Sequence, residues 1–187
     1  MILTLEDKKF LIKVARDTLW AKLADEEKPV YYKDKEIYKQ KKGIFIKMLK
    51  NKKTRAYAGI LSSSKDLIST IQNITLIAGF SDYRFTPISK EEYNDIVFQI
   101  IIVNTIESVK TLNEITPGED GIMIKTNRKS SVLFPWDLPE EYIEKEFINT
   151  VFYKADLDKK DINNAEIFKI TNTLIDERTL EVSPLLN

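Results

Sequence analysis

The stretch from Gly43 to Phe85 constrains the fold more than any other part of the chain, because it predicts a β-hairpin followed by a helix. Residues 44–49 are almost continuously apolar, which is typical of a strand buried on both faces. A lysine-rich turn at residues 50–53 separates this strand from a returning strand at residues 54–61. The stretch therefore predicts two adjacent antiparallel strands.

An amphipathic helix follows the hairpin. Ser63 and Asp66 have the spacing of a helix N-terminal capping box, and apolar residues then recur at helical intervals. Gly79 is a residue type that commonly ends a helix. We expect a loop at residues 82–87, Asp-Tyr-Arg-Phe-Thr-Pro, to close the stretch.

The rest of the chain repeats these two kinds of pattern. Helical periodicity predicts a helix from Thr4, with a capping box to Asp7, and another that begins at Pro139. Strand patterns occur at residues 97–103, 122–134 and 167–175, the second of them as a hairpin. Hairpins mixed with helices predict an α+β fold with a largely antiparallel sheet flanked by helices.

The length of 187 residues suits one domain, and we expect residues 1–187 to form it. Residues 24–42 are polar, rich in lysine and tyrosine, and contain Pro29. This segment is our predicted boundary between two subdomains.

Composition excludes several classes of site. The chain has no cysteine and no histidine, which excludes disulfides, thiol nucleophiles, thiolate or imidazole metal ligands and Ser-His or Cys-His catalytic pairs. The five glycines form no dinucleotide or phosphate-loop fingerprint, and the acidic spacing at residues 156–161 lacks the glycine and terminal glutamate of a calcium loop. We predict no cofactor and no metal.

Net charge and hydropathy limit the classes of partner and the location that we expect for this chain. Lysine plus arginine and aspartate plus glutamate both total 29, so no net field attracts polyanions, and nucleic acid is a disfavoured partner. The longest apolar run, residues 100–103, is far shorter than the roughly 20 residues that cross a bilayer. Glu6 and Asp7 interrupt the start of the chain before any signal-peptide apolar region. We therefore expect a cytoplasmic protein without a membrane segment.

Charged and aromatic residues of the central stretch are the candidates for function. The basic turn from Lys50 to Arg55 is either a phosphate-binding element or a solvated hairpin tip, and the second reading is the simpler one. Asp82 and Arg84 are spaced to pair and hold their loop, although Arg84 or Arg55 could instead present a planar fork to a carboxylate or phosphate. Tyr57 lies mid-strand, where packing is the default role.

The same residues resemble the AMMECR domain family, named for a human chromosomal region linked to Alport syndrome and elliptocytosis. Residues 54–59 resemble the family's Leu-Arg-Gly-Cys-Ile-Gly signature, and residues 82–85 its Asp-Pro-Arg-Phe. Residues 118–122 resemble its Gly-x-His-Gly-Leu, residues 132–135 its Leu-Leu-Leu-Pro run, and residues 154–157 its Lys-Ala-Gly-Leu helix end. The resemblance covers nearly the whole chain.

The departures from this pattern limit what the resemblance implies. Tyr57 stands at the position of the signature cysteine, Ala56 at that of its first glycine, and Asp120 at that of the histidine. Activity that rests on that thiol or imidazole is not carried over. Arg55, Gly59, Asp82 and Arg84 match the pattern.

The resemblance implies a two-part α+β fold, with a smaller α/β subdomain and a cleft beside the signature. It also implies a link, in prokaryotes, with Memo-like and radical-SAM proteins in a modification or metabolic pathway. Our leading hypothesis is that a cleft beside residues 54–59 and 82–87 binds a small anionic ligand or a partner protein, with Arg55 and Arg84 as the anion contacts. An enzyme that uses Tyr57 and Asp82 for acid–base chemistry is the first alternative, and nucleic-acid binding is the second.

Overall fold

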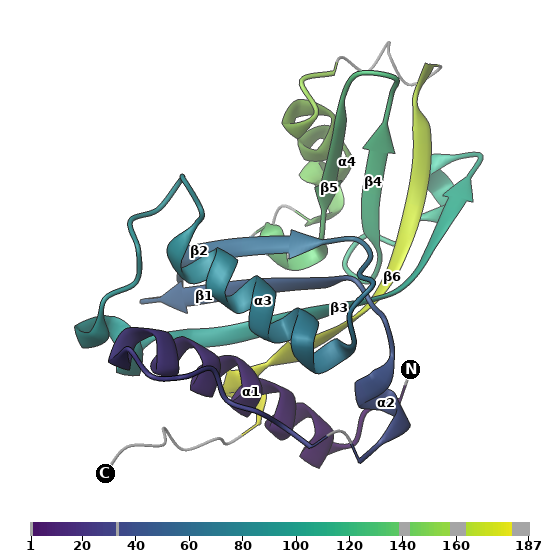
Figure 1. The fold of residues 1–187 in the computed structure, drawn as a ribbon. Helices are drawn as coiled ribbons and strands as arrows, with labels where there is room; N and C mark the ends of the chain where they lie inside the picture. The colour runs from purple at the N-terminus through teal and green to yellow at the C-terminus, as the bar shows by residue number, and fades with distance from the viewer. Residues whose placement is uncertain (1, 33, 139–142, 158–163, 181–187) are drawn as a thin grey trace. The chain divides into compact units, whose positions relative to one another are not determined.

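The computed structural model describes residues 2–32, 34–138, 143–157 and 164–180, and within them the chain has the α+β fold expected from the sequence (Figure 1). The strands are β1 (Ile44–Lys50), β2 (Lys53–Ile60), β3 (Val97–Val109), β4 (Gly121–Lys125), β5 (Ser130–Leu133) and β6 (Glu166–Asp176). The α-helices are α1 (Leu5–Ala24), α2 (Glu36–Lys39), α3 (Leu67–Phe80) and α4 (Ile143–Lys154), and short 3₁₀ helices include η1 (Lys90–Asp95).

The strands form one sheet in the order β2-β1-β3-β6-β4-β5. The pairs β1–β2, β1–β3, β4–β5 and β4–β6 are all antiparallel, as expected for a largely antiparallel sheet, and the first and third are the predicted hairpins. The chain divides into two compact units, with residues 1–102 and 173–187 in unit 1 and residues 103–172 in unit 2. Strands β3 and β6 therefore each contribute residues to both units. The segment 24–42, which we took as a subdomain boundary, lies within unit 1.

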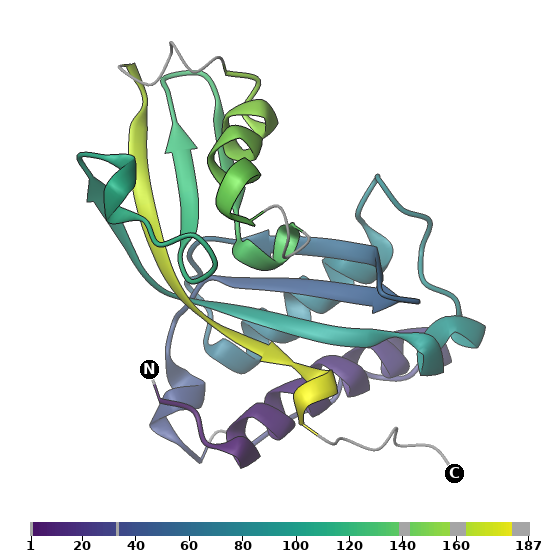
Figure 2. The same ribbon diagram turned by 180° about the vertical axis from the view of Figure 1, so that it is seen from behind.

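Unit 1 packs helices α1 and α3 on one face of β1, β2 and β3, as the views from both sides show (Figures 1 and 2). Alternate residues of β1, Ile44, Ile46 and Met48, point to that face and are completely buried in the core that both helices share. The apolar spacing of each helix supplies the other half of this core. Burial of each large aliphatic side chain in this core stabilises the fold by about 1.5–3 kcal/mol.

Local signals set the helix ends in unit 1. The predicted capping box of α1 is confirmed, because Thr4 Oγ1 accepts from the backbone N–H of Asp7 and Asp7 Oδ2 accepts from the backbone N–H of Thr4. For α3 the N-cap is Asp66, which accepts from the backbone N–H of Ser69, whereas the Ser63 hydroxyl bonds to Thr70. The Asp66 carboxylate therefore caps the helix, and the Ser63 hydroxyl connects the preceding loop to the first turn of the helix.

A buried ion pair joins the chain's far ends in unit 1. The guanidinium of Arg16 on α1 pairs with the carboxylate of Glu177, and its Nη2 also donates to the carbonyl of Ile96 at 2.7 Å. Glu177 accepts in addition from the backbone N–H of Phe98 at 2.9 Å. The residues just after β6 are therefore fixed to α1 and to the start of β3.

Unit 2 combines the β4–β5 hairpin with α4, which lies beside that hairpin (Figure 2). Gly121 is required there, because a Cβ would lie 2.7 Å from the ring of Phe134. Lys154 on α4 donates to the carbonyl of Val132 at 2.9 Å, which occupies one outward group of β5. The expected start of this helix at Pro139 lies outside the described residues.

Strand β3 is longer than its β-branched centre predicted, because it continues to Val109 through polar and exposed residues. None of the helices in the described part of the chain combines the length and the apolar character needed to cross a membrane.

Candidate functional site

Three of the five residues proposed from the sequence, Arg55, Tyr57 and Gly59, lie on the edge strand β2 of unit 1, and the other two, Asp82 and Arg84, lie on the loop that contacts it. Strand β2 is the last strand on its side of the sheet and pairs only with β1. The register places Met48 opposite Ala56 and Leu49 opposite Thr54, so Arg55 is the extra residue of a β-bulge. A bulge re-aims the side chain that it carries, and here that side chain is the arginine of the signature.

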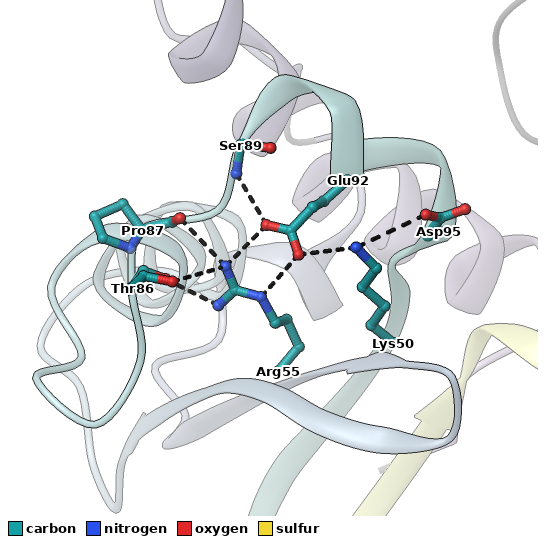
Figure 3. Close-up of polar contacts among 7 residues, drawn as sticks. All are labelled: Lys50, Arg55, Thr86, Pro87, Ser89, Glu92 and Asp95. Atoms are coloured by element: carbon teal, nitrogen blue, oxygen red, sulfur yellow. Dashed lines mark hydrogen bonds and ion pairs between the residues drawn. The ribbon is translucent and has the colours of Figure 1, made fainter.

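Arg55 fastens the segment before η1 to this edge (Figure 3). Its Nε and Nη2 donate to Oε1 and Oε2 of Glu92 at 2.9 and 2.8 Å, which is a two-point ion pair. Its remaining nitrogen, Nη1, donates to the carbonyl of Thr86 at 2.8 Å, and Nη2 also reaches the carbonyl of Pro87 at 3.2 Å. All three guanidinium nitrogens of Arg55 therefore have partners inside the protein.

Glu92 is the centre of this network. It also accepts from Lys50 Nζ at 3.0 Å and from the backbone N–H of Ser89 at 3.2 Å. The hydrogen bonds from Arg55, with those from Lys50, lower the pKa of Glu92 to about 2 against the opposing effect of burial. Lys50 lies 3.9 Å from Asp95 as well. Two basic and two acidic side chains thus meet here, and their formal charges cancel.

Asp82 and Arg84, on the loop after α3, form a second two-point ion pair. Nε and Nη2 of Arg84 donate to Oδ1 and Oδ2 of Asp82 at 2.9 and 2.8 Å. These hydrogen bonds hold the pKa of Asp82 below its usual value, although burial opposes them. The side chain of Asp82 is 5% exposed and that of Arg84 is 49% exposed. The pairing predicted from their spacing is confirmed.

This second pair occupies the outward backbone groups of Tyr57. Arg84 Nη2 donates to the carbonyl of Tyr57 at 2.8 Å, and the backbone N–H of Tyr57 donates to the carboxylate of Asp82. One acceptor and one donor are thus presented to a single residue of an edge strand, as a neighbouring strand would present them. The pair takes the place of a strand at this residue.

Two residues after Tyr57, at Gly59, no other described element covers the edge of β2. Outward-facing backbone groups recur every second residue of an antiparallel edge strand, so those of Gly59 point the same way as those of Tyr57. No described residue outside β1 donates to or accepts from Gly59. Gly59 is needed for packing, because a Cβ there would lie 2.1 Å from the ring of Phe45.

Aromatic side chains surround the exposed guanidinium. The Arg84 Cζ lies 5.9 Å from the ring centre of Tyr57 and 5.6 Å from that of Phe85. The Tyr57 ring in turn lies 6.1 Å from that of Phe45. Tyr83, between Asp82 and Arg84, is 96% exposed. A large aromatic side chain with so little burial contributes almost no packing to the fold.

A comparison with models of known protein families gives a match that covers all of these residues. The sequence profile of AMMECR1 matches residues 12–173, a span that includes the bulged strand, both ion pairs and the loop between them. The chain belongs to the AMMECR1 family.

The proteins similar to this chain come from archaea and from bacteria. Protein MJ0810 of Methanocaldococcus jannaschii is 29% identical over 157 residues, which are 76% of this chain and 77% of that protein. Protein NEQ441 of Nanoarchaeum equitans is 32% identical over 158 residues, 79% of this chain and 86% of its own. The crystal structure of the uncharacterised protein PH0010 of Pyrococcus horikoshii superposes with a TM-score of 0.79 at 21% identity and covers 89% of each chain. The similarity to PH0010 shows a shared fold.

In this AMMECR1-family protein the structure brings together all the predicted site residues but gives the two arginines different partners. The carboxylate of Glu92 was missed, because it lies 37 positions from Arg55. The spacing from Ser89 to Glu92 is that of a capping box, which indicates a local role for Glu92 and says nothing of Arg55. Lys50, which we considered as a phosphate contact, is held by Glu92. Among the described residues no group of three or more metal-ligating side chains is found.

Proposed function

We propose that this AMMECR1-family protein binds an extended segment of a partner protein along the edge of β2 and the adjoining loop, residues 81–87. The observation that carries the proposal is the pairing of Asp82 and Arg84 with the backbone of Tyr57, which leaves the next outward position, Gly59, without a partner among the described residues. An extended peptide would add backbone hydrogen bonds at that position.

Charge favours a peptide over a strongly charged anion. Each arginine of the site already shares a carboxylate at two points, so the local charges largely cancel. A phosphate group would gain little from such a neutralised site, because its binding depends on uncompensated positive charge. A neutral backbone carbonyl needs only a donor, and no described residue accepts from Nη1 of Arg84.

Apolar contact would come from the aromatic side chains of the loop. Tyr83 is almost fully exposed, and tyrosine is enriched at protein interfaces, since it combines a large apolar area with few rotatable bonds. The ring of Phe85 and the half-exposed guanidinium of Arg84 extend the same surface. These three residues supply side-chain contacts beside the backbone contacts of Gly59.

A small carboxylate is the second candidate ligand, and the free Nη1 of Arg84 is the observation that favours it. Acid–base catalysis by Tyr57 and Asp82 has less support. Asp82 accepts hydrogen bonds from the side chain and backbone of Arg84 and from the backbone of Tyr57, and its lowered pKa makes it a weak base.

Photocrosslinking tests the proposal. A photoreactive phenylalanine analogue would replace Tyr83 in the protein expressed in its own host, and crosslinked products would be identified by mass spectrometry. The matched control carries the analogue at Tyr153, which is 84% exposed and lies in unit 2. We expect one reproducible protein adduct from position 83 that is absent from position 153. No adduct at position 83, together with a thermal shift in acetate or citrate that Arg84→Gln abolishes, would favour the carboxylate instead.

A further inference from the structure

A concave region lies in unit 1 and uses none of the side chains of the β2 edge. It is a cavity of about 230 Å³ lined by residues of α1, of the segment that follows α1, and of η1. Two aromatic rings, Trp20 and Tyr93, and three carboxylates, Asp17, Glu26 and Glu27, line it. No lysine or arginine is among its lining residues.

The walls of the cavity are held in place by contacts within unit 1. The rings of Trp20 and Tyr93 lie 5.1 Å apart, and the Tyr93 hydroxyl donates to the carbonyl of Arg16 at 3.4 Å. Gln72 on α3 donates to the carbonyl of Pro29 at 2.8 Å, which fixes the segment after α1 against the helices. The cavity is therefore preformed, and binding would cost little ordering of the protein.

The carboxylates keep acceptor capacity that faces no internal donor. Asp17 receives hydrogen bonds from Lys13 and, at 2.7 Å, from the Tyr31 hydroxyl, both at Oδ2, and none from any described residue at Oδ1. Glu26 and Glu27 are exposed and have no side-chain partner in the described part of the chain. A ligand with N–H donors and positive charge would satisfy these oxygens.

The indole of Trp20 already contacts one ammonium group, that of Lys90, which does not line the cavity. Lys90 Nζ lies 5.0 Å from the ring centre of Trp20, within the range of a cation–π interaction. Lys90 is exposed and lies on the short 3₁₀ helix η1. The indole of Trp20 is therefore accessible to a cation at this distance.

We infer that this cavity binds a protonated alkylamine, with the ammonium between the carboxylates and its methylene groups against Trp20 and Tyr93. Its volume is smaller than the roughly 300–1,000 Å³ of sites for drug-sized ligands, so the ligand is a small amine or one lysine side chain. A primary ammonium is favoured over a quaternary one, because only the former can donate hydrogen bonds to Asp17, Glu26 and Glu27.

Tryptophan fluorescence gives a direct test, because the chain has only two tryptophans. The variant Trp136→Phe leaves Trp20 as the single fluorophore, and calorimetry on the unmodified chain provides the same titration should that variant fold poorly. The probes are putrescine, N-acetyl-lysine methylamide and tetramethylammonium at low ionic strength. We expect saturable binding of the first two and weaker binding of the third. A preference for putrescine indicates a free amine as the ligand, and a preference for the lysine derivative indicates a protein side chain.

Charge-matched variants separate the site from the general charge of the protein. The pair Glu26→Gln and Glu27→Gln removes two acids of the cavity, whereas Glu107→Gln and Glu119→Gln removes two exposed acids of unit 2. The first pair should weaken amine binding by roughly tenfold or more, the scale of one lost hydrogen bond to a charged group, and the second should leave it unchanged. Equal losses from both pairs, no saturable binding, or tighter binding of tetramethylammonium would overturn the inference.

Discussion

Arg55 on β2 and Arg84 on the loop that contacts β2 each make a two-point ion pair with a carboxylate, yet their surroundings differ. The Arg55 and Glu92 side chains are 16% and 18% exposed, and all three guanidinium nitrogens have internal partners. Arg84 is 49% exposed and leaves one nitrogen, Nη1, without an acceptor among the described residues. A charged residue in a family signature can therefore stabilise the fold, as Arg55 does, or form part of the exposed surface, as Arg84 does, and side-chain exposure and the number of satisfied donors distinguish the two.

The largest effect should follow from the loss of Arg55. Arg55→Ala leaves the partly buried Glu92 with Lys50 as its remaining basic partner and frees the carbonyls of Thr86 and Pro87. We expect a loss of about 2–3 kcal/mol in the free energy of unfolding, the scale of a lost hydrogen bond to a charged group. Chemical denaturation measures it. The control Lys53→Ala, at an exposed position of the same strand, should change stability by less than about 0.5 kcal/mol.

The pH dependence of stability should identify Glu92 as a contributor. Its pKa is about 2 in the folded protein and about 4.5 when unperturbed, so its ionised form is stabilised by folding. That stability is fully present above pH 4.5 and is lost as pH falls toward 2. We expect a contribution of no more than about 2 kcal/mol after allowance for solvent screening. Glu92→Gln should flatten the stability curve in this interval, and an unchanged slope would contradict the assignment.

Loss of the Arg84 side chain should affect stability less and binding more. Arg84→Gln removes an ion pair in which one partner is half exposed, and such pairs contribute about 0–1 kcal/mol. The same change removes the donors that lie beside the open edge, so binding of the partner segment should weaken by roughly tenfold. Thermal unfolding and partner capture on one preparation separate the two effects. A stability loss as large as that of Arg55→Ala would remove the distinction between the two arginines.

The smallest stability effect should come from Tyr83. Its side chain is 96% exposed, so Tyr83→Ala should change the free energy of unfolding by less than about 0.5 kcal/mol. Partner binding should still fall, because a large aromatic contact is lost. Unaltered capture by a folded Tyr83→Ala protein would restrict the proposed surface to the backbone edge and Arg84.

The fold was predictable to the extent that its signals are local. The capping box from Thr4 to Asp7, the hairpin around residues 50–53 and the pairing of Asp82 with Arg84 each depend on residues a few positions apart, and each is confirmed. The bulge at Arg55 was not predicted, since no glycine or proline marks it. Its position depends on how β1 and β2 pair.

The partners of the site residues depend on tertiary structure and escaped prediction for that reason. Nothing in the sequence connects Arg55 to Glu92, or the side chains of Asp82 and Arg84 to the backbone of Tyr57, across 25 or more positions. The pocket of Trp20 and Tyr93 was missed as well, because an aromatic residue on a helix is most simply read as core. Residue types and spacing identified where the site lies, and the structure supplied what each residue contacts.

The most direct test of the central claim is the yield of the crosslink from position 83 when Arg84 is replaced by glutamine. If the edge of β2 and its loop bind a partner segment, the yield should fall by roughly tenfold while the unfolding midpoint stays close to that of the parent protein. An undiminished yield from a folded Arg84→Gln protein would contradict the account.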